Sequence, residues 1–155
     1  MTDWANVRVF GVPTTTMSGI VRPSAYGIVA DRRGRLAVVH TPIGLSLPGG
    51  GSDAGEAPEA TVVRETREEG GLDIRVGLWR RNAIEHMFST AELAQFEKRS
   101  TFCDATVLGS AETPSEPDHL LEWMPAADAA ALLVPASHRW AVTEWRTSSA
   151  SEVAE

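Results

Sequence analysis

The chain has 155 residues, of which 43% are hydrophobic and 23% charged, and its net charge at pH 7 is −7. This length and composition predict one globular domain with a sizeable core. The negative charge argues against a surface for a nucleic-acid polymer, which needs a basic footprint. No apolar run approaches the length of a membrane span.

The cysteine count and the first residues bear on the compartment. Cys103 is the only cysteine, so no internal disulfide can form, and we expect it to be a small buried residue. The residues after Met1 lack a basic segment followed by a hydrophobic one, which predicts no signal peptide. Both observations favour a cytoplasmic location.

Alternating polar and apolar residues predict the strands of the first part of the chain. We expect a strand at 7–10 and a hairpin built from the apolar runs 26–31 and 36–40, with Gly34 at a positive φ in its turn. The run Gly49-Gly50-Gly51 would be costly inside a regular element. We therefore expect a turn there, or backbone that passes close to a ligand.

A helix is predicted after the glycine run. It begins near Ala57, since Pro58 is tolerated in a first helical turn, and it ends where Gly70 and Gly71 supply a left-handed stop. One side of this helix can face a core and carries Val62, Val63 and Thr66.

Three carboxylates of this helix project from one stripe, because successive residues turn by about 100°. They are Glu65, Glu68 and Glu69. The cluster is unfavourable by itself, since like charges at i and i+4 repel and anions near a helix C-terminus oppose its dipole. A divalent cation would relieve both effects, because Mg²⁺ prefers carboxylate oxygens. The alternative is a solvated acidic face.

The rest of the chain predicts further strands and helices. Alternation predicts strands at 72–78, 79–88, 101–108 and 119–124. Ser89 and Glu92 form a capping box, which predicts a short helix at 90–96. An Ala-rich helix is expected at 125–134, and Ser137 can cap a final helix that runs to about Arg146. The small, polar tail 147–155 is expected to be disordered, so the domain would span 1–146.

The stretch from Gly50 to Leu72 resembles the signature of the Nudix hydrolase family, which includes the MutT-like enzymes. The signature positions in register are Gly50, Glu56, Arg64, Glu65, Glu68, Glu69, Gly71 and Leu72. Only Thr66 departs, at a position where the family usually has an aliphatic residue. Periodicity alone predicts an α+β layered domain. The resemblance implies the narrower Nudix fold, a mixed β-sheet sandwiched between helices in an α/β/α arrangement.

The resemblance also implies a chemistry, the hydrolysis of a phosphoanhydride bond by water that bound Mg²⁺ or Mn²⁺ activates. It assigns the metal ligands to Glu68, Glu69 and the backbone carbonyl of Gly50. Glu65 can bind a second metal or act as the base, and the spacing does not choose between these roles. Glu56 is implied as a structural residue behind the ligands, and Arg64 as a partner of a carboxylate that fixes the loop against the helix.

Outside this stretch the candidates are weaker. Related enzymes use an additional base or ligand from a later strand or loop, for which the candidates are Glu112, Glu116, Asp118 and His119. Distal phosphates could contact a basic side chain among Arg80, Arg81, Lys98 and Arg99. Solvated surface charge is the alternative for each, and a structural role is the alternative for His119.

The substrate class stays open between a nucleoside triphosphate and a nucleoside diphosphate linked to another group. The markers that accompany some Nudix groups downstream of the signature are missing: residues 73–113 contain no proline, and the only tyrosine, Tyr26, lies upstream. The rival hypothesis is a catalytically silent Nudix domain that acts as a nucleotide sensor, which usually lacks some of the carboxylates present here. The resemblance also allows a homodimer.

Overall fold

The computed structural model describes residues 2–13, 19–110 and 118–154. Its strands are β1 (Arg8–Phe10), β2 (Ile20–Ala30), β3 (Arg35–Thr41), β4 (Gly44–Ser46), β5 (Gly49–Gly51), β6 (Leu72–Ser89), β7 (Ala94–Ser110) and β8 (Leu120–Pro125). The helices are the 3-10 turn η1 (Trp4–Asn6), α1 (Pro58–Gly70), α2 (Ala126–Leu132) and α3 (Ala136–Ala154). None of these helices is long and apolar enough to cross a membrane.

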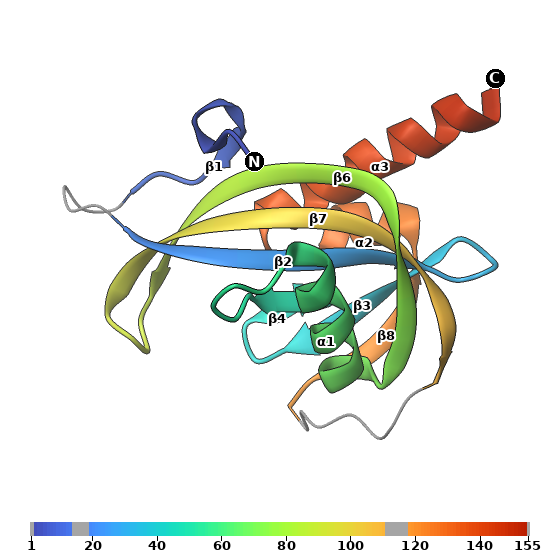
Figure 1. Cartoon of the computed structure of the whole chain (residues 1–155), viewed down its shortest axis with the longest axis horizontal. Coiled ribbons are helices and arrows are strands. Elements are labelled where there is room, and N and C mark those ends of the chain that lie inside the picture. The colour runs from blue at the N-terminus through green and yellow to red at the C-terminus, as the bar shows by residue number, and fades with distance from the viewer. Residues whose placement is uncertain (1, 14–18, 111–117, 155) are drawn as a thin grey trace.

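The eight strands of the described residues form one mixed sheet, in the order β1-β6-β7-β2-β3-β4, with β5 paired to β2 and β8 to β3. Parallel pairs join β1 to β6 and β2 to β7, and the other pairs are antiparallel. In Figure 1, α1 lies in front of this sheet and α2 and α3 lie behind it. The architecture is therefore α+β in three layers, as the sequence predicted.

Alternate residues of the central strands supply two cores, one on each face of the sheet. In β2, Tyr26 and Ile28 pack on the side of α2 and α3, whereas Ala25 and Val29 pack on the side of α1. The core under α1 contains Val62, which is fully buried. Burial of such a side chain stabilises the fold by about 1.5–3 kcal/mol. The position of α1, and of the carboxylates on it, is fixed by this packing.

The helix end predicted from the two glycines is confirmed. Gly71 adopts a left-handed conformation with φ of 64°, and its N–H donates to the carbonyl of Arg67 at 2.9 Å. The hairpin turn is also confirmed, with Gly34 at φ of 76°.

The glycine run differs from the expectation of a simple turn. Gly49–Gly51 form the short strand β5, which pairs antiparallel with Ser24, Ala25 and Tyr26 of β2. Glycine is required at the first position, because a Cβ on Gly49 would lie 2.2 Å from the carbonyl oxygen of Ala25. The backbone here passes unusually close to a neighbouring strand, and the same strand faces α1.

The short helix predicted at 90–96 is wrong. The capping contact does form, since the N–H of Glu92 donates to the hydroxyl of Ser89 at 3.2 Å, but residues 90–93 make only a turn. Leu93 adopts a positive φ of 49°, and β7 begins at the next residue. Pairing between β6 and β7, which includes the partners Met87 and Phe96, overrides the local helix signal.

The last helix continues past Arg146, so the segment expected as a disordered tail is helical through Ala154. Contacts with β6 explain part of this extension: the indole N–H of Trp79 donates to the hydroxyl of Ser148 at 3.3 Å, and Arg81 donates to it at 3.4 Å. The start also differs. The N–H of Ser137 donates to the carboxylate of Glu85, at 2.9 Å, so a side chain of β6 caps this helix.

Candidate active site

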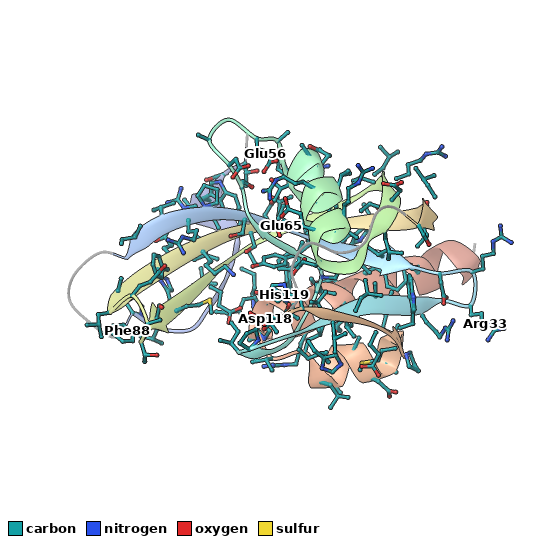
Figure 2. All side chains as sticks on the ribbon, turned by 90° about the horizontal axis from the view of Figure 1, so that it is seen from below. Arg33, Glu56, Glu65, Phe88, Asp118 and His119 are labelled. Atoms are coloured by element: carbon teal, nitrogen blue, oxygen red, sulfur yellow. The ribbon has the colours of Figure 1, made fainter. Side chains whose placement is uncertain are left out.

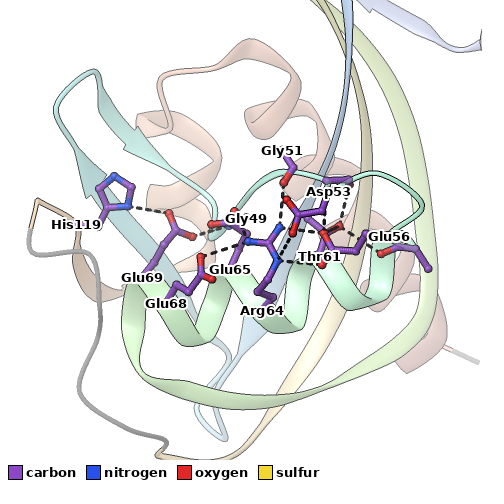
Figure 3. A network of polar contacts seen from close by, with 12 residues as sticks. Gly49, Gly51, Asp53, Glu56, Thr61, Arg64, Glu65, Glu68, Glu69 and His119 are labelled. Carbon is purple, nitrogen blue, oxygen red and sulfur yellow. Dashed lines mark hydrogen bonds and ion pairs between the residues drawn. The ribbon is translucent and has the colours of Figure 1, made fainter.

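The three carboxylates of α1 face the glycine strand β5, as Figure 3 shows. A Cβ on Gly50 would lie 3.0 Å from the carboxyl carbon of Glu65, so this carboxylate lies directly against the strand. The side chains of Glu65, Glu68 and Glu69 are 14%, 36% and 3% exposed. The last turns of α1 and the strand β5 therefore lie against each other, and they form the candidate site.

Arg64 connects the loop after β5 to the acidic face of α1. Its Nε and Nη2 donate to the two carboxylate oxygens of Glu56, at 2.9 Å each, and Nη2 also donates to the carbonyl of Gly51 at 3.1 Å. Its Nη1 donates to Glu65 at 3.1 Å and to Glu68 at 3.3 Å. The expected pairing of Arg64 with a carboxylate is confirmed, and one guanidinium neutralises part of the cluster.

Glu56 is held by several donors at once. Besides Arg64, its Oε1 accepts from the hydroxyl of Thr61 at 2.8 Å and from the N–H of Asp53 at 3.0 Å. Hydrogen bonds from Arg64, then from Asp53 and Thr61, lower the pKa of Glu56 from 4.5 to about 2. The same carboxylate, followed by Glu65, raises the pKa of Arg64. Glu56 is thus an ionised anchor of the loop rather than a group that faces a ligand.

Glu69 is the most buried of the three carboxylates. Its Oε1 accepts from the N–H of Gly49 at 2.8 Å, and its Oε2 lies 3.1 Å from Nδ1 of His119. His119 directly precedes β8, fifty residues later in the chain. Of the two candidates outside the signature that lie within residues 118–154, Asp118 and His119, it is His119 that the structure brings to the carboxylates.

The oxygen atoms at this site are of the type that a hard divalent cation prefers, because carboxylates of α1 lie beside backbone carbonyls of β5. In the arrangement described here, no three His, Cys, Asp or Glu side chains of the described residues converge closely enough to hold an ion. Glu65 and Glu68 are turned toward Arg64, and Glu69 toward Gly49 and His119. Ligation by Glu65 and Glu68 would therefore require their carboxylates to rotate away from the guanidinium.

A cavity of about 430 Å³ opens beside Glu69, and we refer to it as the Glu69 cavity. Apolar side chains of Ile43, Leu45, Met87 and Val134 make part of its wall. Its ionisable or aromatic lining residues are Tyr26, Glu69, Glu85, Lys98, His119 and His138. Its mixture of apolar wall and few polar groups is typical of a small-molecule site.

His138 provides a fixed neutral group in this wall. Burial lowers its pKa well below 6.5, and the charges of Lys98 and Arg139 add to this effect. Its Nδ1 accepts from the N–H of Leu47 at 3.1 Å, so in the neutral ring the proton is on Nε2. The ring packs against Tyr26, with centroids 4.3 Å apart.

The four basic side chains that were candidates for phosphate contacts lie in different surroundings in the structure. Lys98 lines the Glu69 cavity and donates to the hydroxyl of Tyr26. Arg80 pairs with Glu59 on α1, Arg81 contacts Ser148 on α3, and Arg99 donates to Glu97 at 2.7 Å. Neighbouring residues of a strand point to opposite faces, which explains why Lys98 reaches the cavity and Arg99 does not.

The remaining candidates are less informative. Asp118 is exposed in a turn ahead of His119. Glu112 and Glu116 lie outside the described residues. Sequence reasoning missed Tyr26, Glu85 and His138, whose shared cavity depends on the packing of β2, β6 and α3 rather than on a local motif. The signal that could have found one of them is the register of the β6–β7 pair, in which Glu85 lies opposite Lys98.

The sequence matches the model of the NUDIX domain over residues 21–145, which is most of the chain. No curated protein sequence gives a significant match.

Several solved structures are similar to this one. The MutT protein from Methanosarcina mazei Go1 has a TM-score of 0.64 and 17% identity, over 86% of this chain and 99% of that chain. A dihydroneopterin triphosphate pyrophosphohydrolase from E. coli has a TM-score of 0.55 and 16% identity, over 81% and 96%. An ADP-ribose pyrophosphatase from Streptococcus suis 89-1591 has a TM-score of 0.55 and 20% identity, over 81% and 91%. At these identities the likenesses establish the fold, and they confirm the predicted α/β/α sandwich.

Proposed function

The chain belongs to the Nudix family and is a pyrophosphohydrolase of that family, and we propose that it requires Mg²⁺ or Mn²⁺ to cleave a phosphoanhydride bond. The substrate is a small nucleotide, either a nucleoside triphosphate or a nucleoside diphosphate linked to another group. The carrying observation is the placement of Glu65, Glu68 and Glu69 in one turn of α1 against the glycine strand β5. This position is where the family signature expects the metal and the reacting phosphates.

The residues that would hold the cation are Glu65, Glu68, Glu69 and the carbonyl of Gly50. When bound, the cation supplies neutralisation of phosphate charge and activation of water. Arg64 and Glu56 hold the site in place, because their paired hydrogen bonds and the bond from Arg64 to the carbonyl of Gly51 fix the loop against α1. The glycines leave room for phosphate oxygens next to the backbone, since no side chain projects from β5.

Two residues outside the signature contribute to this function. His119 is a positioning residue for Glu69, because its Nδ1 lies 3.1 Å from Oε2 of that carboxylate. Lys98 contacts a substrate phosphate, because it is the basic side chain of the four candidates that lines the Glu69 cavity.

The test is hydrolysis of a panel of nucleotides with Mg²⁺ or Mn²⁺, with both products identified. Glu69→Gln should keep the fold and reduce the rate by about 100-fold or more, since a preorganised charge is lost at the reacting centre. Glu144→Gln, on α3 at the other face of the sheet, is the matched control. Hydrolysis by Glu69→Gln at the wild-type rate would show that the site is elsewhere.

Metal binding has its own readout. A ligand present at 100 times its Kd stabilises the folded state by about 2.7 kcal/mol, so Mg²⁺ should raise the melting temperature of the wild type and have a smaller effect on Glu68→Gln. Nucleotide binding without hydrolysis in the same assays would instead support the sensor hypothesis.

A further inference from the structure

A second cavity adjoins the Glu69 cavity. It has a volume of about 590 Å³ and lies between β2 and the β6–β7 hairpin, and we refer to it as the hairpin cavity. The residues that belong to it alone include Arg22, Ser24, Gly51, Phe88, Glu92 and Phe96. The two cavities share Ile43, Met87, Lys98 and Val134 in their walls, so they meet at Lys98, the only lysine of the chain.

The glycine strand β5 runs along both cavities. Gly49 lines the Glu69 cavity, Gly51 lines the hairpin cavity, and the site of a Cβ on Gly50, between them, faces Glu65. A phosphoanhydride bound along β5 would therefore have one end directed to each cavity. Lys98 is placed at the junction, where it can contact the phosphates from the side opposite the carboxylates.

The hairpin cavity has the chemistry of a site for a hydroxylated ring. The hydroxyl of Ser24 is buried and has no hydrogen-bond partner within the described part of the chain. The guanidinium of Arg22 lies 4.0 Å from the centroid of the Phe96 ring and 3.7 Å from the carboxylate of Glu92. A serine, an arginine and a carboxylate can bond to hydroxyl groups, while Phe88 and Met87 offer an apolar surface to the C–H face of a ring.

We propose that the hairpin cavity is a second substrate subsite, which takes the sugar of a nucleoside diphosphate sugar while the nucleoside occupies the Glu69 cavity. This proposal rests on the hydrolase function proposed above and narrows its substrate class. A nucleoside triphosphate carries no sugar beyond its terminal phosphate and would leave the hairpin cavity unfilled. Arg22 and Ser24 then determine specificity, and neither belongs to the hydrolytic site.

The test compares a nucleoside diphosphate sugar with the triphosphate of the same base in four proteins: wild type, Arg22→Ala, Ser24→Ala and Arg33→Ala. The control Arg33 lies in the turn at the opposite end of the molecule from Phe88, as Figure 2 shows. Arg22→Ala should raise the KM for the sugar nucleotide by about ten-fold, the loss expected for one charge-assisted hydrogen bond. Its kcat, and both constants for the triphosphate, should stay within about two-fold of wild type, as should those of Arg33→Ala.

Ser24→Ala separates a specificity effect from a folding effect. Removal of a buried hydroxyl without a partner should leave the unfolding free energy unchanged or raise it, while the KM for the sugar nucleotide rises. A parallel rise in KM for both substrates would overturn the proposal, as would a wild-type preference for the triphosphate or for a dinucleoside polyphosphate.

The outcomes also separate this inference from the hydrolase function. If the triphosphate alone is cleaved, the hydrolase function stands and the sugar subsite is refuted. If neither substrate is cleaved, the hydrolase function fails, and calorimetric binding of a methylene-bridged, non-hydrolysable sugar nucleotide decides the subsite. Weaker binding to Arg22→Ala than to Arg33→Ala would support it, and equal binding would overturn it.

Discussion

Thr66 is the signature position at which this chain departs from the family pattern, and it provides a sharp test of the structure. The side chain lies on α1 with 0% exposure, and its hydroxyl has no hydrogen-bond partner within the described residues. Thr66→Val replaces this hydroxyl with a methyl group of similar shape. We expect the substitution to stabilise the protein.

The magnitude follows from the burial. A buried hydroxyl without a partner costs about 1–3 kcal/mol, and the new methyl group adds burial worth up to about 0.8 kcal/mol. Helix propensity changes little, since valine and threonine rank together. For a domain of this size, a gain of about 1–3 kcal/mol raises the melting temperature by roughly 2–4 °C per kcal/mol.

The matched control is Thr61→Val, on the same helix and also at 0% exposure. The hydroxyl of Thr61 contacts Ser52 and the carboxylate of Glu56, each at 2.8 Å, and the carbonyl of Ala57 at 3.3 Å. Removal of this hydroxyl leaves buried polar partners unsatisfied, so we expect a loss of about 1–3 kcal/mol. The two substitutions are chemically identical and should have opposite signs.

Urea unfolding, followed by circular dichroism, measures both free energies on one scale. Equal slopes with denaturant concentration would show that the two variants unfold like the wild type. Destabilisation by Thr66→Val, or the same sign for both variants, would refute the reasoning. It would mean that the hydroxyl of Thr66 has a partner or that the core around α1 cannot accept the methyl group.

Three further outcomes test other parts of the structure. The pKa of Glu56 is lowered to about 2, so its hydrogen bonds stabilise the fold above pH 4.5. This contribution is lost as the pH falls from 4.5 toward 2. The unfolding free energies of wild type and Glu56→Gln should therefore converge over that range. Burial lowers the pKa of His138 well below 6.5, so below about pH 6.5 the unfolded chain binds a proton that the folded chain does not. The unfolding free energy of the wild type should therefore fall as the pH drops through 6.5. The fall should be smaller in His138→Gln. Gly49→Ala should lower the unfolding free energy by roughly 3 kcal/mol or more, because φ at this position is 146° and the added Cβ would lie 2.2 Å from a carbonyl oxygen. The control Gly55→Ala has a φ of 75° and no atom within 4 Å of the added Cβ, so it should lower the unfolding free energy by about 1 kcal/mol. Urea unfolding measures both.

Features with a local physical cause could be predicted from the sequence. Pro58 and Gly71 mark the ends of α1 because each depends on its own backbone geometry, and the structure agrees at both. The one-turn spacing of Glu65, Glu68 and Glu69 likewise requires only that a helix forms. Alternation located the strands, although β2 and β7 extend well beyond the apolar runs at 26–31 and 101–108.

Features that depend on distant partners could not be predicted. The capping contact of Ser89 is real, but pairing of β6 with β7 decides the structure of residues 90–96. The helical state of residues 147–154 involves Ser148, which bonds to Trp79 and Arg81 of β6, far earlier in the chain. A polar, small-residue segment is predicted as disordered only if nothing packs against it.

The same distinction applies to the acidic cluster itself. From the sequence, the repulsion among the three carboxylates required an external cation. In the structure Arg64 supplies part of that positive charge, because its guanidinium bonds to Glu65 and Glu68, and the ring of His119 lies beside Glu69. Only the first of these partners belongs to the signature.

On the proposed function, this arrangement would couple metal binding to the loop that Arg64 holds. For Glu65 and Glu68 to ligate a cation they must release Nη1 of Arg64, whereas the Nε and Nη2 bonds to Glu56 can remain. The guanidinium would therefore stay bonded to Glu56, while Nη1 would become available to another negatively charged group. On the proposed function, a nucleotide phosphate would provide that charge, so the cation and the phosphate would compensate each other at Arg64, and each should bind more tightly in the presence of the other. Arg64 thus relieves part of the repulsion among the carboxylates, and on the proposed function the metal and the phosphate together would relieve the rest.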